Sequence, residues 1–532
     1  MMPAPKPTTT RKTRSSTPRA RTGCSTCRTR HVKCDETRPS CLKCIKAGWK
    51  CDGYPAQPNP PKSNGALENS PQSLVVAATK SLNITSYSIP FRIPGSQKDR
   101  QILHYFCVQG ASDISGFLPS EFWSQTVLQH SHREPVVRQA LVALSSLHLD
   151  YVTADSLGAE VAGPETLLQY GRALRALHKR LASPGQDATK LALVCCILFY
   201  CFESTVGNAE AAMRHLDNGL QVLSSTQEGP IFGAQGSAGD IEALSGILAR
   251  LDLQASLFDD GRVPILSLTS DSERENGIGG LNGDRPFSNL QTAQTVLDRL
   301  QNWLIRLLTT NASCYRNMEV EAIPCEILEE KQCLDTAAAR WRQKFALWCA
   351  TNETADEKTL CWTQMLRINY QITDMMLAAT IPDDEAMFSA NPNLVAHEIL
   401  DRVASVIELA KQKDKTADAA TNARRNFASE NGVIIPLFLL AVKCSDELVF
   451  ERASQMLAVC NRREGLYDAA SMVEVLKHLS AVKAERKLAL EKQGVKDVGN
   501  TSLENWAPDL INERDGGMDM IGKSTSRTLA PP

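Results

Sequence analysis

Six of the seventeen cysteines stand close together near the amino terminus. A C-x2-C pair places two thiolates on one tight turn, so both reach the same ion, and a third cysteine arrives after a short helix. Zinc takes four such ligands in a tetrahedron, and two separate sites would need eight thiolates. Sharing two thiolates between two ions satisfies both, and the first cysteine of each half is the natural bridge. The spacing is two tandem copies of C-x2-C-x6-C: Cys24, Cys27, Cys34, Cys41, Cys44 and Cys51.

Two other arrangements of six cysteines are a three-disulfide knot and a single four-cysteine zinc site. The knot needs an oxidising compartment, but the first residues are polar and basic, with no apolar segment typical of a secretory signal. A single site would leave two cysteines idle and the twofold spacing unexplained. The sequence therefore predicts zinc as cofactor, two Zn²⁺ per cluster, with Cys24 and Cys41 as the bridging ligands.

Charge is unevenly distributed along the chain. Residues 1–51 contain 13 Lys and Arg against Asp35 and Glu36, a balance of +11, within a total of −2. The remaining residues therefore carry −13. A basic head on an acidic body indicates that the head binds a polyanion. Six thiolates and two Zn²⁺ sum to −2, so any attraction to phosphate must come from the surrounding side chains. The candidates are Arg28, Arg30, His31, Lys33 and Lys43.

The segment GCSTCRTRHVKCDETRPSCLKCIKAGWKCDGY resembles the fungal zinc binuclear-cluster (Zn2Cys6) transcription factors. Pro39 stands two residues before Cys41, where that family places a loop-turning proline. Val32, Ile45 and Trp49 occupy positions where the family buries small apolar contacts around the metals. A module of this size buries too little apolar surface to fold alone, so zinc must supply the folding free energy.

The resemblance implies a nuclear, non-enzymatic, sequence-specific DNA-binding regulator of transcription, acting at RNA polymerase II promoters. The first short helix would enter the major groove and read a CGG-like triplet. Arg30 and His31 align with the family's base-reading pair, and an arginine donates twice to guanine O6 and N7. His31 departs from the Lys or Arg that is commoner there, so Arg30 is the favoured reader. Arg28, Lys33 and Lys43 would position the module on phosphates.

The partners expected are double-stranded DNA and the transcription machinery. One module reads about three base pairs, too few to specify a genomic site. A second module, from a homodimer or a heterodimer, is therefore expected. No sustained heptad pattern follows the cysteines to indicate how such a dimer forms.

Composition divides the chain into five segments. The expected fold is a small zinc-stabilised binuclear-cluster module of two short helices and loops, followed by a large all-α helical domain. Residues 1–22 read as a disordered basic arm, 23–54 as the Zn2Cys6 domain, 55–97 as a flexible linker, 98–494 as the all-α regulatory domain and 495–532 as a disordered acidic tail.

Apolar residues in the large segment recur at helical spacing. Examples are Val136 to Leu147, Val296 to Leu307, and the stripe of Leu167, Leu174, Leu177 and Leu181 behind Pro164. A last long helix is expected from Asp468 to about Lys492. Leu103–Tyr151 and Phe427–Ala469 also resemble the helical regulatory region of the same fungal family.

No catalytic motif is visible, so an enzyme is not indicated. His130 and His132 read as a polar patch at a helix start, and Cys195, Cys196 and Cys201 as core residues. The longest apolar run, Leu191–Phe202, is too short to span a bilayer, and no membrane partner is expected. Two alternatives remain open: a zinc-tethered module for single-stranded nucleic acid or protein, and a helical enzyme brought to chromatin by the zinc module.

Overall fold

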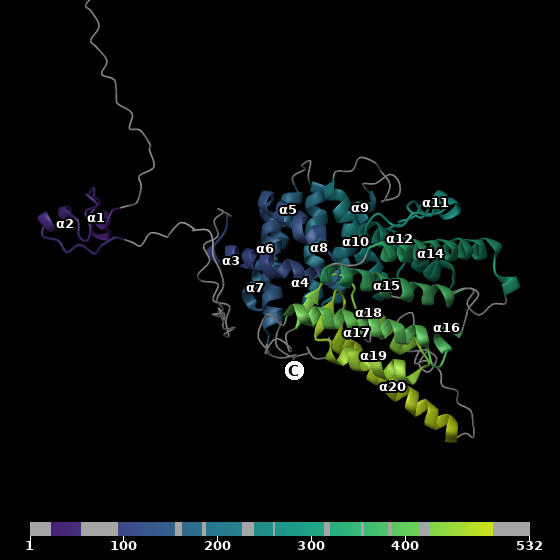
Figure 1. Cartoon of the computed structure of the whole chain (residues 1–532). Coiled ribbons are helices and arrows are strands. Elements are labelled where there is room, and N and C mark those ends of the chain that lie inside the picture. Colours follow the sequence, from purple (N-terminus) through teal and green to yellow (C-terminus); the bar gives the residue numbers. More distant parts are fainter. Residues whose placement is uncertain are drawn as a thin grey trace, which may run out of the picture. The chain divides into compact units, whose positions relative to one another are not determined.

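The computed structural model describes residues 23–54, 94–154, 162–182, 188–225, 239–258, 261–312, 320–352, 356–380, 386–414 and 425–492 (Figure 1). The chain divides into two compact units, Met1–Val76 and Ala77–Pro532. The predicted basic arm, the predicted acidic tail and nearly all of the predicted linker lie outside the described residues. Those three predictions therefore stay predictions.

The small unit contains two one-turn helices joined by loops, as the sequence predicts. They are α1 (Ser25–Thr29) and α2 (Leu42–Lys46). Each helix begins directly after a cysteine whose sulfur accepts a hydrogen bond from the amide three residues ahead, Cys27 for α1 and Cys44 for α2. A thiol sulfur thus takes the place of the oxygen that usually caps a helix start.

The first half of the large unit is a set of packed helices. Helix α6 packs against both α7 and α8, and α8 packs against α9. Proline occupies the first turn of α6 and of α7, where its missing N–H costs no helical hydrogen bond. The elements are α3 (Gln97–Tyr105), η2 (Phe106–Gly110), α4 (Ala111–Ser115), η3 (Phe122–Thr126), α5 (Val127–Arg133), α6 (Pro135–Thr153), α7 (Pro164–Leu181), α8 (Ala188–Val206), α9 (Ala209–Ser225) and α10 (Gly239–Phe258).

The second half continues the helical pattern. Helix α12 packs against α10, α14 and α15, and α18 packs against α19. The predicted last helix is confirmed as α20. The elements are α11 (Asp271–Asn276), α12 (Leu290–Leu307), η4 (Leu308–Ala312), η5 (Val320–Ala322), α14 (Cys325–Thr351), α15 (Glu357–Ala378), α16 (Ala386–Ser389), α17 (Leu394–Asp414), α18 (Ile434–Lys443), α19 (Glu447–Val459) and α20 (Ala469–Lys492).

A three-stranded sheet interrupts the helices and was not expected from the sequence. Strand β1 (Asn426–Ala428) pairs in parallel with β2 (Arg462–Glu464), and β2 pairs antiparallel with β3 (Tyr467–Asp468). Strands of two or three residues are too short to show an alternating pattern, so the sequence does not predict them. The prediction of a zinc-cluster module followed by a large helical domain is confirmed with this small addition.

The sheet is tied to the helices by a buried carboxylate. Glu464 is fully buried and accepts hydrogen bonds from the amides of Gly432, Val433 and Ile434 at 2.9, 3.1 and 3.0 Å. Its other partner is the guanidinium of Arg462, at 2.9 Å. These amides precede and open α18, so the carboxylate satisfies donors that have no partner within the helix.

Two clusters of buried apolar side chains form the core of the large unit. Helix α8 lies in the first. Cys195 and Cys201 are fully buried there as predicted, whereas Cys196 is half-buried. Among the described residues, α8 alone meets the length and hydropathy of a membrane-spanning helix, a test that core helices also pass; two thirds of its most apolar stretch is buried inside the unit. This burial matches the prediction that Leu191–Phe202 belongs to a core helix.

Two details of the sequence interpretation are wrong. The stripe predicted for α7 does not face the core throughout, because Leu167 and Leu181 are 47% and 40% exposed. Thr166, Tyr170 and Ala173 form the buried face instead. The pair His130 and His132 lies in the last turn of α5 rather than at a helix start.

Candidate metal centre and nucleic-acid interface

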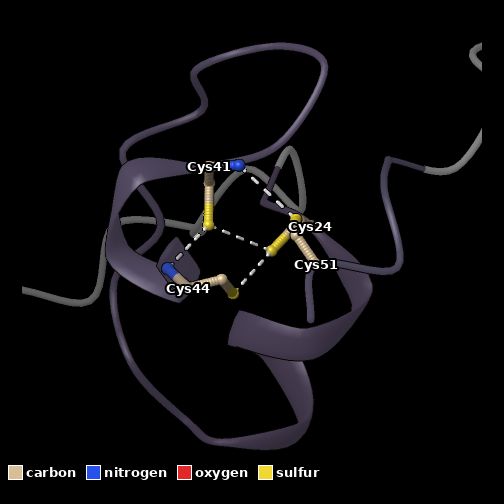
Figure 2. A group of neighbouring side chains, drawn as sticks. All are labelled: Cys24, Cys41, Cys44 and Cys51. Carbon is tan, nitrogen blue, oxygen red and sulfur yellow. Dashed lines mark hydrogen bonds between the residues drawn. The ribbon is translucent and has the colours of Figure 1, made fainter. Parts of the chain in front are cut away.

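The six clustered cysteines form two overlapping groups of four. Within each group the sulfur atoms all lie within 4.8 Å of one another. Cys24 and Cys41 belong to both groups, and their sulfurs are 3.5 Å apart (Figure 2). Among the described residues these are the two groups of Cys, His, Asp or Glu side chains whose geometry suits a metal ion. Cys27 and Cys34 complete one group, and Cys44 and Cys51 complete the other.

The two halves repeat the same hydrogen bonds. The amide of Cys24 donates to Cys34 Sγ at 3.5 Å, and the amide of Cys41 donates to Cys51 Sγ at 3.4 Å. Both are in addition to the amide donors that open each helix. The two halves, which have the same cysteine spacing, therefore also have the same backbone-to-sulfur hydrogen bonds. These bonds orient the sulfur atoms without the help of a metal ion.

Sulfur geometry rules out disulfides among the innermost cysteines. Cys27 Sγ lies 3.6 Å from Cys41 Sγ and 3.7 Å from Cys44 Sγ, far from the roughly 2.05 Å of a bonded pair. All six cysteines are free. Cys24, Cys27, Cys41 and Cys44 are fully buried, so these four form the interior of the module.

Burial opposes ionisation of the inner thiols. It raises the pKa of Cys24 to about 12 and also raises the pKa of Cys27 and of Cys41. The outer Cys34 differs: burial would raise its pKa, but the amides of Cys24 and Glu36 and the hydroxyl of Tyr54 outweigh burial and lower its pKa to about 6. A nearby cation would favour the thiolate form of Cys24, Cys27 and Cys41, and an all-thiolate set of ligands suits zinc. The residues present fit the metal.

Both helices of the module end in the same way. After α1, the amides of His31 and Val32 donate to the carbonyls of Arg28 and Cys27 at 3.2 and 3.1 Å. After α2, Gly48 and Trp49 make the equivalent bonds to Ile45 and Cys44 at 3.1 and 2.9 Å. This is the Schellman motif, which requires a left-handed residue. Gly48 (φ 70°) supplies it in the second half, and His31 (φ 56°) supplies it in the first.

The candidate DNA-contacting side chains occupy different environments. Arg28, His31, Lys33 and Lys43 are exposed, whereas Arg30 is half-buried. The guanidinium of Arg30 lies over the indole of Trp49, 4.7 Å from the ring centroid, and its Nη1 is buried without a hydrogen-bond partner among the described residues. Stacking holds the guanidinium while leaving a strong donor unused.

The expectation that Val32, Ile45 and Trp49 pack around the metals is wrong. They are 43%, 58% and 55% exposed, respectively. The four buried cysteines already fill the space inside the module, so these apolar side chains remain on its surface. Trp49 instead links the two halves, because it follows α2 while Arg30 ends α1.

Two contacts that the sequence analysis did not predict hold the ends of the module together. Thr26 Oγ1 donates to Asp52 Oδ2 at 2.8 Å and accepts from the Asp52 amide at 3.0 Å, which ties α1 to the chain after Cys51. The hydroxyl of Tyr54 donates to the carbonyl of Thr37 at 2.9 Å. The available signal was their position: both Asp52 and Tyr54 lie just behind the last cysteine.

Comparison with known proteins agrees with this geometry. Residues 22–61 match the fungal Zn(2)-Cys(6) binuclear cluster domain, and residues 101–482 match the fungal specific transcription factor domain. The chain is 29% identical over 351 residues to the aspercryptin biosynthesis cluster-specific transcription regulator atnN of Emericella nidulans, a match that covers 62% of this chain and 54% of that protein.

A second relative is the transcription regulator lscL of Purpureocillium lilacinum, 31% identical over 212 residues, or 38% of this chain and 49% of that protein. The chain thus spans about half the length of these two relatives. No solved structure matches. Because the second domain match alone covers well over half of the 532 residues, the chain belongs to the fungal Zn(2)-Cys(6) transcription factors, a family of zinc-binding, DNA-binding transcription regulators rather than enzymes.

Proposed function

We propose that this protein is a nuclear, sequence-specific DNA-binding regulator that reads CGG-like triplets in the major groove at RNA polymerase II promoters. The observation that carries the proposal is the pair of four-cysteine groups joined through Cys24 and Cys41, surrounded by exposed basic side chains. Residues 23–54 act as the DNA-binding domain and residues 98–494 as the regulatory domain.

The six cysteines would hold two Zn²⁺, with Cys24 and Cys41 shared between the two sites. Cys27 and Cys34 would complete one set of four ligands, and Cys44 and Cys51 would complete the other. The membership of the two groups supports this assignment, since only the proposed bridging cysteines belong to both. Zinc would stabilise the thiolate form of these cysteines and so couple metal binding to the folding of the module.

Arg30 reads the base. Among the candidate contacts in the described residues, it is the one whose guanidinium is stacked on another side chain, Trp49. A guanidinium already ordered in the free protein loses less conformational entropy when it donates to guanine. Arg28, Lys33 and Lys43 are exposed and better suited to phosphates, whose position tolerates a mobile chain end.

His31 has a backbone role beside any contact with DNA. Its left-handed conformation closes the motif that ends α1, and so directs Arg30 and Lys33 to their places. A pair of modules, from a homodimer or a heterodimer, reads two triplets, and the large unit communicates with the transcription machinery.

The decisive experiment selects random duplex DNA with the full-length protein, once with zinc and once with a chelator. We expect zinc-dependent enrichment of CGG-like triplets, with a fixed spacing if the protein acts as a dimer. Sequence-blind, salt-sensitive binding that survives chelation would contradict the proposal. A parallel selection with single-stranded DNA tests the alternative that the module binds single strands. In that case sequences would be enriched in the single-stranded selection and not in the duplex selection.

Variants test the role of Arg30. Arg30→Ala should lower affinity for the selected site by about 10-fold or more and relax preference at one base pair, since a bidentate arginine contributes ~1–3 kcal/mol. Lys43→Ala, the matched control, should lower affinity equally on all sequences. Trp49→Ala should reproduce part of the Arg30→Ala effect and add little to it in the double variant. Independent, additive losses would show that the stack does not position Arg30.

A further inference from the structure

A cavity of about 80 Å³ lies inside the large unit where four helices meet. Helices α10, α12, α15 and α18 contribute to its wall, and they lie side by side in Figure 1. Most of the lining is apolar, including Leu304, Ile372 and Leu439. Ile372 belongs to one of the two apolar core clusters and Leu304 to the other, so the cavity lies at the boundary between them.

The charged side chains of this cavity do not balance. Its ionisable lining residues are Arg250, Asp298 and Glu430, whose side chains are only 16%, 11% and 5% exposed. Arg250 forms a bidentate ion pair with Glu430, because its Nε and Nη2 both donate hydrogen bonds to that carboxylate. Its Nη1 lies 3.7 Å from Asp298 Oδ2, beyond a normal hydrogen bond. When Asp298 is ionised, two carboxylates face one guanidinium, and burial keeps water from screening the excess negative charge.

Some hydrogen-bonding groups of the lining are paired, and others are not. Gln301 Nε2 donates to Thr373 Oγ1 at 3.0 Å, and that hydroxyl donates to the carbonyl of Asn369 at 2.7 Å, so these lining groups are paired. Asn431 Oδ1 is buried without a partner among the described residues. Asp298 and Asn431 therefore leave acceptors in the cavity, and a donor must enter to satisfy them.

We propose that this cavity is a binding site for a small organic amine. The apolar part of the ligand packs between α12, α15 and α18, and its ammonium group donates to the carboxylate of Asp298 and to Asn431 Oδ1. The cation also cancels the charge excess that Arg250 leaves. By volume the enclosed part has room for roughly five waters, so it takes a ligand body of a few carbon atoms. Nothing in this site depends on DNA binding.

Three isosteric probes test the charge preference: 3-methylbutylamine, 3-methylbutan-1-ol and 3-methylbutanoate. Each is titrated into the zinc-loaded full-length protein, with binding followed by saturation-transfer NMR and calorimetry. We expect the amine to bind with a dissociation constant of ~1 mM or tighter, which is the range for so few atoms. The alcohol should bind more weakly, and the carboxylate at least 10-fold more weakly than the amine. Equal binding of amine and carboxylate would overturn the proposal, as would no binding of the amine at about 10 mM.

Three variants locate the site. Asp298→Asn should weaken amine binding at least 10-fold while changing alcohol binding less than twofold. Leu439→Trp fills the cavity from a half-buried position and should abolish binding of both. Asp401→Asn removes a carboxylate that is 70% exposed on α17 and should change neither. The thermal unfolding midpoint of the large unit serves as the check that each variant is folded. Amine binding that survives both cavity variants would place the ligand elsewhere and refute the assignment.

Discussion

The small module and the large helical unit bury different chemistry. The fully buried side chains of the module are four cysteines, while its Ile45 and Trp49 are more than half exposed. In the large unit Trp123, Trp303 and Trp341 are at most 1% exposed. Each large apolar side chain contributes about 1.5–3 kcal/mol on burial. The large unit can therefore fold on apolar burial, whereas the module lacks that source of free energy and needs its metal.

The strongest test of this contrast is removal of the metal. A chelator should abolish specific DNA binding and the structure of the module, because zinc contributes ~10–16 kcal/mol in comparable small domains. The unfolding midpoint of the helical unit should not change. Circular dichroism and DNA-binding titrations measure the two responses.

Cys34→Ala should have the same effect as chelation, since it deletes one of the six sulfurs. Cys107→Ala, which alters an exposed cysteine of the large unit, is the control and should behave like the wild type. Retention of specific DNA binding by Cys34→Ala would remove the metal cluster from the mechanism.

The reverse test damages the large unit and leaves the module intact. A methyl group at Gly432 would lie 2.4 Å from Glu464 Oε1 and 2.7 Å from the ring of Phe117. Because three amides hold that carboxylate in place, Gly432→Ala should cost about 3 kcal/mol in the free energy of unfolding. Zinc content should stay unchanged. Denaturant unfolding followed by tryptophan fluorescence measures the loss.

Gly171→Ala is the matched glycine substitution for that experiment. Gly171 lies inside α7, and its nearest neighbour is the flexible end of Arg175 at 3.5 Å. Alanine should raise stability there by up to about 1 kcal/mol, because it favours the helix. Equal effects of the two substitutions would show that the packing around Gly432 is looser than described.

A buried carboxyl group should make the stability of the large unit depend on pH. Burial raises the pKa of Asp298 from its ordinary 3.8 to about 7; Glu430 acts in the same direction and Arg250 opposes it. The folded state therefore binds more protons than the unfolded state between those values, and its stability falls as pH rises through that window. Asp298→Asn should remove this pH dependence. The free energy of unfolding of the variant, relative to that of the wild type, should therefore rise by roughly 2 kcal/mol from pH 5 to pH 8. An advantage independent of pH would contradict the assignment; thermal unfolding across that range measures it.

The smallest effect should come from exchanging the residues that end α1 and α2. A left-handed backbone conformation costs a residue other than glycine ~1–2 kcal/mol. Replacement by glycine recovers only part of this free energy, because glycine also makes the unfolded state more flexible and so more favourable. His31→Gly should therefore stabilise the module by about 0.5 kcal/mol, and Gly48→Ala should destabilise it by about 1 kcal/mol. Zinc competition against a chelator reports both. If His31→Gly instead lowers DNA affinity 10-fold at unchanged zinc affinity, the imidazole contacts DNA directly.

Helix prediction succeeded where a long apolar stripe was unambiguous. In α12 the predicted residues from Val296 to Leu307 are buried, because the stripe is continuous over the whole helix. In α7 the helix was right but its buried face was right only in part: Leu174 and Leu177 pack against the core, whereas Leu167 and Leu181 are exposed. Apolar spacing reports a helix, but the neighbouring helices decide which side faces the core.

The sequence by itself determined the cysteine module, its tandem repetition and the separation of a basic head from a helical body. Those features depend on residues close together in the chain, where spacing alone limits the geometry. Tertiary structure decided the rest: the stack of Arg30 on Trp49, the anchoring of α18 by Glu464, and the meeting of Arg250 with Glu430 across 180 residues. Such contacts depend on how whole helices pack, and no local pattern of residue types records which distant partners that packing brings together.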